Sequence, residues 1–275
     1  MNKGLRREII RRGEELYTLL KNGDYTAISA KRDQLFNPLE EVAQRHSLEI
    51  EEPSRSLKRR VYDALLTNLK SAWDYAKKNE FSTDTLKAVN GLILLGNPNE
   101  VRFRDSAAFI LGDEVKLPPR AEKIENELRK VSYDYNVFKA MAKQDQVNAL
   151  ELAAYLHLQI ARIHPFFDGN GRSARIIQNG TLARYFLPPA IINDTESVVY
   201  FRMLKRAIND LDGNEGRIFD EECRSPENDS MKWFGEFVDF IGSKVAASMD
   251  QIIEASKNHQ PHVHKRKTSG KFRKQ

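Results

Sequence analysis

Residues 161–175, ARIHPFFDGNGRSAR, concentrate side chains that could do chemistry. His164 directly follows a segment with apolar residues at helical spacing, and a second such segment begins at Arg172. The Gly-Asn-Gly at 169–171 is therefore expected at a helix N-terminus, where exposed N–H groups and the helix dipole attract anions. The two arginines that follow supply fork-shaped donors suited to phosphate oxygens.

The acid and the base in this stretch narrow the chemistry further. Asp168 would repel a bound phosphate unless a cation lay between them, and Mg²⁺ is the cation that carboxylates and phosphates normally share. His164 is the side chain best suited to titrate near neutral pH and to act as a general base. The stretch thus predicts a Mg²⁺-nucleotide site with a base. The structural alternative makes His164 a helix cap and Asp168 a turn residue. The Gly-Lys-Ser/Thr ending of a P-loop is absent, which disfavours that fold.

Helices must position this loop, because helical periodicity extends over most of the chain. It is found in residues 4–22, 54–79, 82–96, 120–131, 148–163, 172–186, 197–209 and 230–254. Ser82 is the expected N-cap of one helix, and Gly96 its stop. Residues 100–119 instead alternate apolar and polar positions around the turn signal Gly112-Asp113. We predict an all-α helical bundle with one small β-hairpin.

Composition narrows the class of protein. The formal net charge is +5, but residues 257–275 alone carry seven positive charges and no acid, so the rest of the chain is nearly neutral. Such a run usually forms a solvated end, and nucleic acid is not an expected partner. The single cysteine, Cys223, excludes an internal disulfide and fits a reducing cytoplasm. No signal-peptide pattern and no apolar run of about 18 residues is present, so no membrane association is expected.

The motif His164-Pro165-Phe166-x-Asp168-Gly169-Asn170-Gly171-Arg172-x-x-Arg175 resembles the signature of the Fic family, H-x-F-x-(D/E)-G-N-G-R-x-x-R, at every defining position. Residues 101–119 resemble the flap hairpin of that family, and VVYFRMLKRA, starting at Val198, resembles its later tyrosine-bearing helix. The resemblance predicts an N-terminal helical region at 1–81, a catalytic core at 82–240, and a helix end with a basic tail at 241–275.

The resemblance implies a protein adenylyltransferase that moves AMP from ATP to a Ser, Thr or Tyr hydroxyl of a target protein. His164 would take the hydroxyl proton, Asp168 would hold Mg²⁺, and Phe166 would anchor the loop in the core. The flap, about 102–113, would pair with the target backbone as an added strand. The nucleotide would be bound by Gly169, Asn170, Gly171, Arg172, Arg175 and, at the adenine, Tyr200. A phosphotransferase branch of the family has lysine at the position of Gly171, so the glycine favours adenylylation. Transfer of another nucleotide or of phosphocholine stays open.

Many members of this family carry an inhibitory helix with the pattern (S/T)-x-x-x-E-(G/N), whose glutamate pairs with the second arginine of the motif. Ser47-x-x-Ile50-Glu51 matches this pattern upstream of the flap, although Glu52 stands where the family has Gly or Asn. We assign the inhibitory role to Ser47 and Glu51. Glu215-Gly216 is the rival segment, and an exposed acidic helix end before Pro53 is the plain structural alternative.

Two other functions stay open at this point. One is a nucleotide-binding regulatory module without catalysis, against which the complete motif with its histidine counts. The other is a toxin restrained by a separate antitoxin, which an internal brake would make unnecessary. The expected partners are ATP and a protein with a hydroxyl side chain, and self-association into a homodimer is left open.

Overall fold

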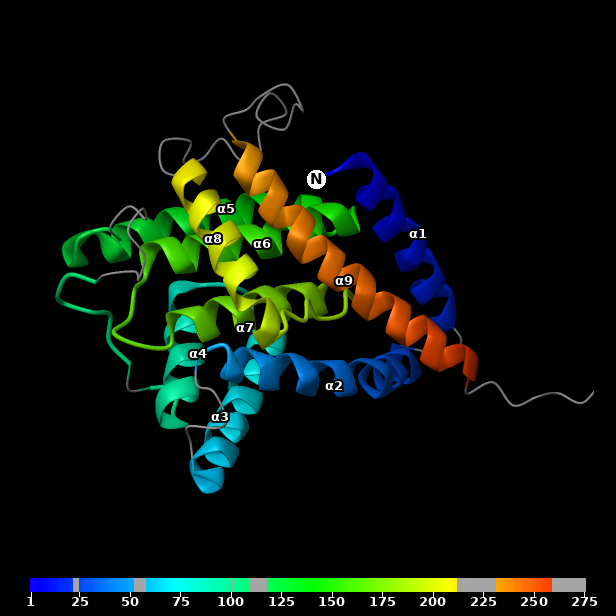
Figure 1. Cartoon of the computed structure of the whole chain (residues 1–275), viewed down its shortest axis with the longest axis horizontal. Helices are drawn as coiled ribbons and strands as arrows, with labels where there is room; N and C mark the ends of the chain where they lie inside the picture. Colours follow the sequence, from blue (N-terminus) through cyan, green and yellow to red (C-terminus); the bar gives the residue numbers. More distant parts are fainter. Residues whose placement is uncertain (22–24, 52–57, 100, 109–117, 212–230, 259–275) are drawn as a thin grey trace, which may run out of the picture.

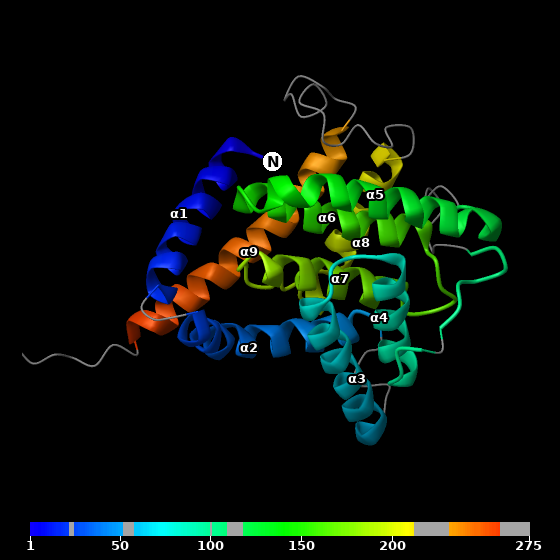
Figure 2. The ribbon, with the colours of Figure 1, turned by 180° about the vertical axis from the view of Figure 1, so that it is seen from behind.

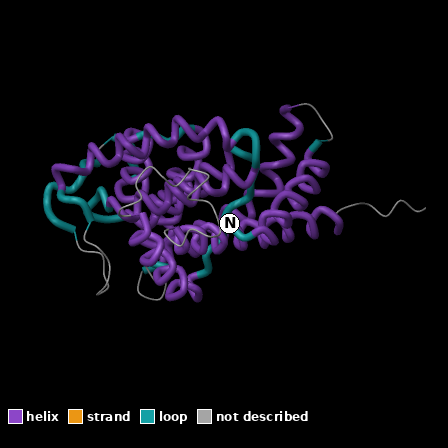
Figure 3. The backbone as a smooth tube through the Cα atoms, turned by 90° about the horizontal axis from the view of Figure 1, so that it is seen from above, coloured by secondary structure: helices purple, strands orange, loops and turns teal. Residues whose placement is uncertain are grey.

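The computed structural model describes residues 1–21, 25–51, 58–99, 101–108, 118–211 and 231–258, and within them it contains helices and loops but no strand (Figures 1 and 3). The all-α prediction is confirmed. The helices are α1 (Lys3–Leu20), α2 (Tyr25–Glu49), α3 (Arg59–Lys78), α4 (Thr83–Leu95), α5 (Ile124–Ala142), α6 (Gln146–Ile163), α7 (Asn170–Arg184), α8 (Ser197–Leu211) and α9 (Lys232–Asn258), with short 3₁₀ turns η2 (Ala121–Lys123) and η3 (Asp194–Glu196).

Helices α6 and α7 form the centre of the molecule, as their burial shows. Every residue from Leu152 to Ile163 and from Arg172 to Ala183 is buried, the pattern of a helix surrounded by protein on all sides. Helix α5 packs on α6, while α3 and α4 pack on α7 (Figure 2). Helix α9 crosses the α6–α7 layer, and α1 lies along the outer side of α9 (Figure 1). The loop between α6 and α7 therefore starts and ends on buried helices that are packed on several sides.

Helix α4 begins and ends where the sequence predicts. The Ser82 side chain accepts a hydrogen bond from the Thr85 N–H at 3.0 Å, which satisfies one of the free donors of the first turn. Gly96 ends the helix in the left-handed region at φ 65°, where glycine carries no steric penalty. This helix also carries Asn90, which reaches the central loop.

Helix α2 was not predicted from the sequence, and its composition explains why. Pro38 lies inside it and removes one backbone donor. Its buried face mixes apolar residues with polar ones, namely Phe36, Leu39, Glu40, Ala43, Gln44, Ser47 and Leu48. The apolar stripe is therefore too sparse to stand out by periodicity. The C-terminal end of α2 contacts α7.

Two predicted boundaries are wrong. Helix α5 continues to Ala142 rather than ending at 131. Tyr135 and Ala142 continue its buried stripe at helical spacing, although the other residues of this part of the helix are polar or aromatic and exposed or half-buried. Helix α3 begins at Arg59, with Lys58 as its N-cap, rather than at 54.

The β-hairpin expected at 100–119 stays a prediction. Residues 101–108 are loop, and 109–117 lie outside the described residues. The division of the chain at residues 81 and 240 also stays a prediction, since buried residues from α1 to α9 share one hydrophobic core. Among the described helices, none is both long and apolar enough to cross a membrane.

Candidate active site

The loop from His164 to Gly169 joins the two central helices and is fixed by its own side chains. The Asn170 amide bridges the backbone of Phe166, accepting from its N–H at 2.9 Å and donating to its carbonyl at 2.8 Å. The Phe166 ring is buried, which confirms its predicted anchoring in the core. Gly169 has φ 76° and precedes the first residue of α7, so the left-handed conformation requires glycine there.

Asn90 of α4 hydrogen-bonds to the loop and to the first turn of α7. Its Nδ2 donates to the Asp168 carbonyl at 3.0 Å and to Ser173 Oγ at 3.1 Å. A Cβ at Gly169 would lie 2.8 Å from the same Nδ2. Loop and helix therefore approach so closely that only glycine fits.

Arg104 fastens the segment before the flap to the end of α6. It is 3% exposed, and among the described residues its guanidinium donates to backbone carbonyls only. These are His164 (2.7 Å), Ser106 (2.7 Å), Pro119 (2.6 Å) and Ile163 (3.3 Å). Its backbone N–H donates to the Pro165 carbonyl at 2.9 Å. Both ends of the segment 107–118 are thus tied to the residues around His164.

His164 ends α6 in the left-handed region, with φ 48° and ψ 58°, which is uncommon for a residue other than glycine. Burial lowers the pKa of its imidazole. A hydrogen bond with the Ala161 backbone opposes this shift, Arg104 adds to it, and the charges of Glu51 and Asp168 also oppose it. The net shift is downward, so His164 is neutral at pH 7, the form that a general base requires.

The start of α7 faces the carboxylate of Glu51, which lies two residues past the end of α2. Glu51 Oε1 accepts from an Nη of Arg175 at 2.7 Å, and its Oε2 lies 3.1 Å from Arg172 Nε as an ion pair outside hydrogen-bonding geometry. A Cβ at Gly171 would lie 2.2 Å from Glu51 Oε1. The carboxylate therefore occupies the space that the missing side chain leaves.

Ser47 binds the same arginine one helical turn earlier. Its Oγ accepts from Arg175 Nε at 2.8 Å, and its carbonyl accepts from an Nη at 3.0 Å. Burial alone would lower the pKa of Arg175, but the charges and hydrogen bonds of Glu51 and Tyr200 together outweigh burial and raise that pKa. The guanidinium is thus a fully charged, buried group with its donors turned toward α2.

A polar stack lies behind Arg175. The Tyr200 hydroxyl is 3.4 Å from an Nη of Arg175 and 2.9 Å from His157 Nε2, and His157 Nδ1 is 2.7 Å from Gln178 Oε1. Burial lowers the pKa of His157 to about 3, with a further contribution from Arg175. His157 is therefore a neutral hydrogen-bonding group within this stack.

A family model described as Fic/DOC family matches residues 80–182. Over residues 80–182 the chain thus resembles the Fic/DOC family. The protein adenylyltransferase Fic of Nematostella vectensis is 33% identical over 106 residues, which are 38% of this chain and 23% of that protein. The match thus spans about a quarter of the length of this curated relative.

Solved Fic structures share the fold. A Fic domain containing signaling protein from Bacteroides thetaiotaomicron superposes with a TM-score of 0.67 at 19% identity, covering 92% of this chain and 99% of that one. Fic-1 from C. elegans superposes with a TM-score of 0.64 at 17% identity, covering 94% of this chain and 74% of that one. The likeness extends well beyond the matched residues 80–182, to the N-terminal and C-terminal helices.

The structure brings the residues of the loop together with Ser47 and Glu51, which lie outside the matched range. Asp168 is the exposed one of the predicted site residues, with 65% of its side chain accessible, and Arg172 donates to it at 3.1 Å. Tyr200 differs from expectation. It is fully buried behind Arg175, so in this conformation it supports the arginine and offers no surface to adenine.

Asn90 and Arg104, both within the matched range, were missed by sequence reasoning. Asn90 carries a weak signal, as a polar residue inside the apolar run AVNGLILL. Nothing in RFR distinguishes Arg104 from Arg102. The rival segment with Glu215, the tip of the flap, Cys223 and the basic tail from residue 259 lie outside the described residues.

Proposed function

We propose that the chain is a protein adenylyltransferase, which moves AMP from ATP to a hydroxyl side chain of a target protein, and that Glu51 holds this activity back. The observation that carries the proposal is the loop itself. A neutral imidazole, His164, stands at one end of it, and a helix N-terminus flanked by the buried arginines 172 and 175 stands at the other. Such a helix end with arginines suits the phosphates of a nucleotide.

The proposed reaction uses these groups in fixed roles. His164 accepts the proton of the attacking hydroxyl, whose oxygen forms a bond to the α-phosphorus of ATP. The bond from that phosphorus to the bridging oxygen breaks, and pyrophosphate leaves. The N–H groups at the start of α7, together with Arg172 and Arg175, stabilise the charge on the phosphates. Asn170 acts through the loop, because its side chain is already bonded to Phe166.

Asp168 is the residue that would hold Mg²⁺. Its carboxylate is exposed beside the phosphate-binding helix end, and one carboxylate shared with substrate phosphates is the usual way in which proteins bind this ion. Bound Mg²⁺ would neutralise phosphate charge during the transfer. The single cysteine, Cys223, excludes an internal disulfide, which suits a reaction carried out in the cytoplasm.

The brake follows from competition for one guanidinium. Arg175 gives its donors to Glu51 and Ser47, whereas a γ-phosphate would require the same donors. Glu51 also occupies the space over Gly171. An internal brake of this kind needs no separate antitoxin, and a neutral histidine in the loop favours an enzyme over a non-catalytic module.

The test is transfer of label from α-labelled ATP with Mg²⁺, either to the chain itself or to proteins of a cell extract. We expect transfer by Glu51→Gly, and a loss of about 10²–10⁴-fold when His164→Ala is added, while the double variant still binds ATP. Undiminished labelling by the double variant would remove His164 from its role. Labelling from γ-labelled ATP alone would replace adenylylation with phosphorylation.

A further inference from the structure

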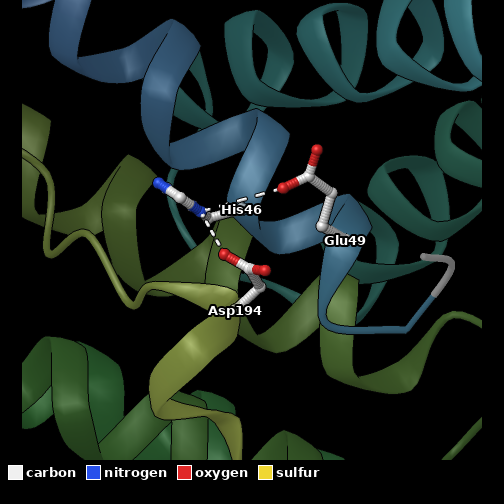
Figure 4. Close-up of side chains that lie close together, drawn as sticks. All are labelled: His46, Glu49 and Asp194. Carbon is white, nitrogen blue, oxygen red and sulfur yellow. Dashed lines mark hydrogen bonds and ion pairs between the residues drawn. The ribbon is translucent and has the colours of Figure 1, made fainter. Parts of the chain in front are cut away.

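A second group of chemistry-bearing side chains lies outside the loop. His46 and Glu49 come from the last turn of α2, and Asp194 comes from η3 (Figure 4). His46 Nδ1 is 3.0 Å from Asp194 Oδ1 and 4.0 Å from Glu49 Oε2. One donor atom from each residue lies within 4.8 Å of the other two. Figure 4 shows both carboxylates turned toward the imidazole.

The charges around this group are unbalanced. Among the described residues, neither Glu49 nor Asp194 forms an ion pair with a lysine or arginine. Two other carboxylates on these elements do have a lysine partner: Glu40 of α2 pairs with Lys77 at 2.7 Å, and Glu196 of η3 pairs with Lys244. Two carboxylates thus converge on a single imidazole, and a cation between them would balance the charge.

The donor types and their spacing select the kind of cation. His46 and Glu49 are three positions apart on one helix, a spacing that places two ligands side by side. An imidazole combined with carboxylates suits first-row transition ions and Zn²⁺ better than Mg²⁺, which takes oxygen ligands. Glu49 Oε1 accepts from the Tyr62 hydroxyl at 3.2 Å, and such an outer hydrogen bond orients a ligating carboxylate.

We propose that His46, Glu49 and Asp194 bind a divalent transition metal ion or Zn²⁺, and that this ion fastens the end of α2 to the core. Two ligands lie on α2 and the third lies 145 or more positions later in the chain, so a bound ion would bridge the two elements. Ser47, which holds Arg175, is the next residue after His46. The ion would therefore stabilise the contact of Glu51 with Arg175. This last step rests on the proposed function, whereas the metal site does not.

Zn²⁺ binding to the untagged full chain tests the site directly. By calorimetry we expect one tight equivalent, weakened at least tenfold by His46→Ala and by Asp194→Asn, and weakened to a smaller degree by Tyr62→Phe. Asp168→Asn and His262→Ala remove metal donors elsewhere in the chain and should leave this binding unchanged. The site is refuted if the wild type binds no Zn²⁺, or if both ligand variants bind it as tightly as the wild type.

Hydrogen exchange and activity then test the clamp. Zn²⁺ should slow amide exchange of residues 46–51 in the wild type and not in His46→Ala. It should also slow AMP transfer by the wild type while leaving Glu51→Gly unaffected, which separates the clamp from competition with Mg²⁺. Zn²⁺ binding without slower exchange would overturn the clamp. If no variant transfers AMP, the proposed function fails, while binding and exchange still decide the metal site.

Discussion

Two buried arginines hold the two sides of the candidate active site, and they do so with different partners. Arg104 and Arg175 are each 3% exposed. In the part of the chain that the structure describes, Arg104 donates to backbone carbonyls alone, all within 60 positions of it. Arg175 donates to a hydroxyl, a carbonyl and a carboxylate of the segment 47–51, more than 120 positions away.

The partners decide whether each contact can be exchanged. The carbonyls that bind Arg104 are fixed parts of the backbone, which a ligand would not displace. Burial lowers the pKa of Arg104. A carboxylate and a phosphate accept the same hydrogen bonds from a guanidinium, so one can replace the other. We therefore expect changes around Arg104 to damage the molecule, and changes in the partners of Arg175 to release it.

The largest expected effect is that of Arg104→Lys. An ammonium has three donors and cannot reach carbonyls spread around a planar fork, so several buried carbonyls lose their partner. The free energy of unfolding should fall by about 3 kcal/mol, measured by urea denaturation. Arg102→Lys, at an exposed neighbouring position, should change it by no more than about 0.5 kcal/mol. Equal losses in the two variants would contradict the role given to Arg104.

The stack behind Arg175 should respond to pH. The pKa of His157 is about 3 in the folded state and about 6.5 in an unfolded chain. Below pH 6.5, His157 becomes protonated in the unfolded chain but stays neutral in the folded protein. The free energy of unfolding therefore falls as the pH falls toward 3. Between pH 8 and pH 5 this one group should cost about 2 kcal/mol. In His157→Gln, the difference in the free energy of unfolding between pH 8 and pH 5, measured by denaturation, should be smaller by this amount. An unchanged slope would mean that His157 is protonated in the fold.

A smaller effect is expected from Ser47→Ala, which removes one of the contacts of Arg175 and leaves Glu51 in place. The lost hydrogen bond corresponds to about 1 kcal/mol, so AMP transfer should rise by roughly fivefold. Ser47→Thr keeps a hydroxyl and should behave as the wild type does. Slower transfer by Ser47→Ala would show that this serine serves the reaction rather than its inhibition.

The elements built on regular apolar spacing were predictable from the sequence. Helices such as α4 and α6 carry their pattern, caps and stops within one short segment. Helix α2 was not predictable in this way, since the residues that it buries include Glu40, Gln44 and Ser47. Glu40 and Ser47 can be buried because the distant residues Lys77 and Arg175 bind them.

The same distinction holds for the candidate site. The loop residues are contiguous in the chain, so the sequence alone predicts that they share one location. The contact between Glu51 and Arg175 followed from a resemblance, and the geometry is consistent with it. Asn90 and Arg104 act through the backbone of the loop, and their partners are peptide groups that no side-chain pattern identifies.

The rate of AMP transfer from α-labelled ATP by Glu51→Gly, relative to the wild type, tests the central claim most directly. Removing the carboxylate frees Arg175 for the γ-phosphate, and we expect a gain of at least tenfold, which is about 1.4 kcal/mol or more. Glu215→Gly, the rival position, should show no gain. Equal rates for Glu51→Gly and the wild type, or a gain in Glu215→Gly alone, would contradict the account.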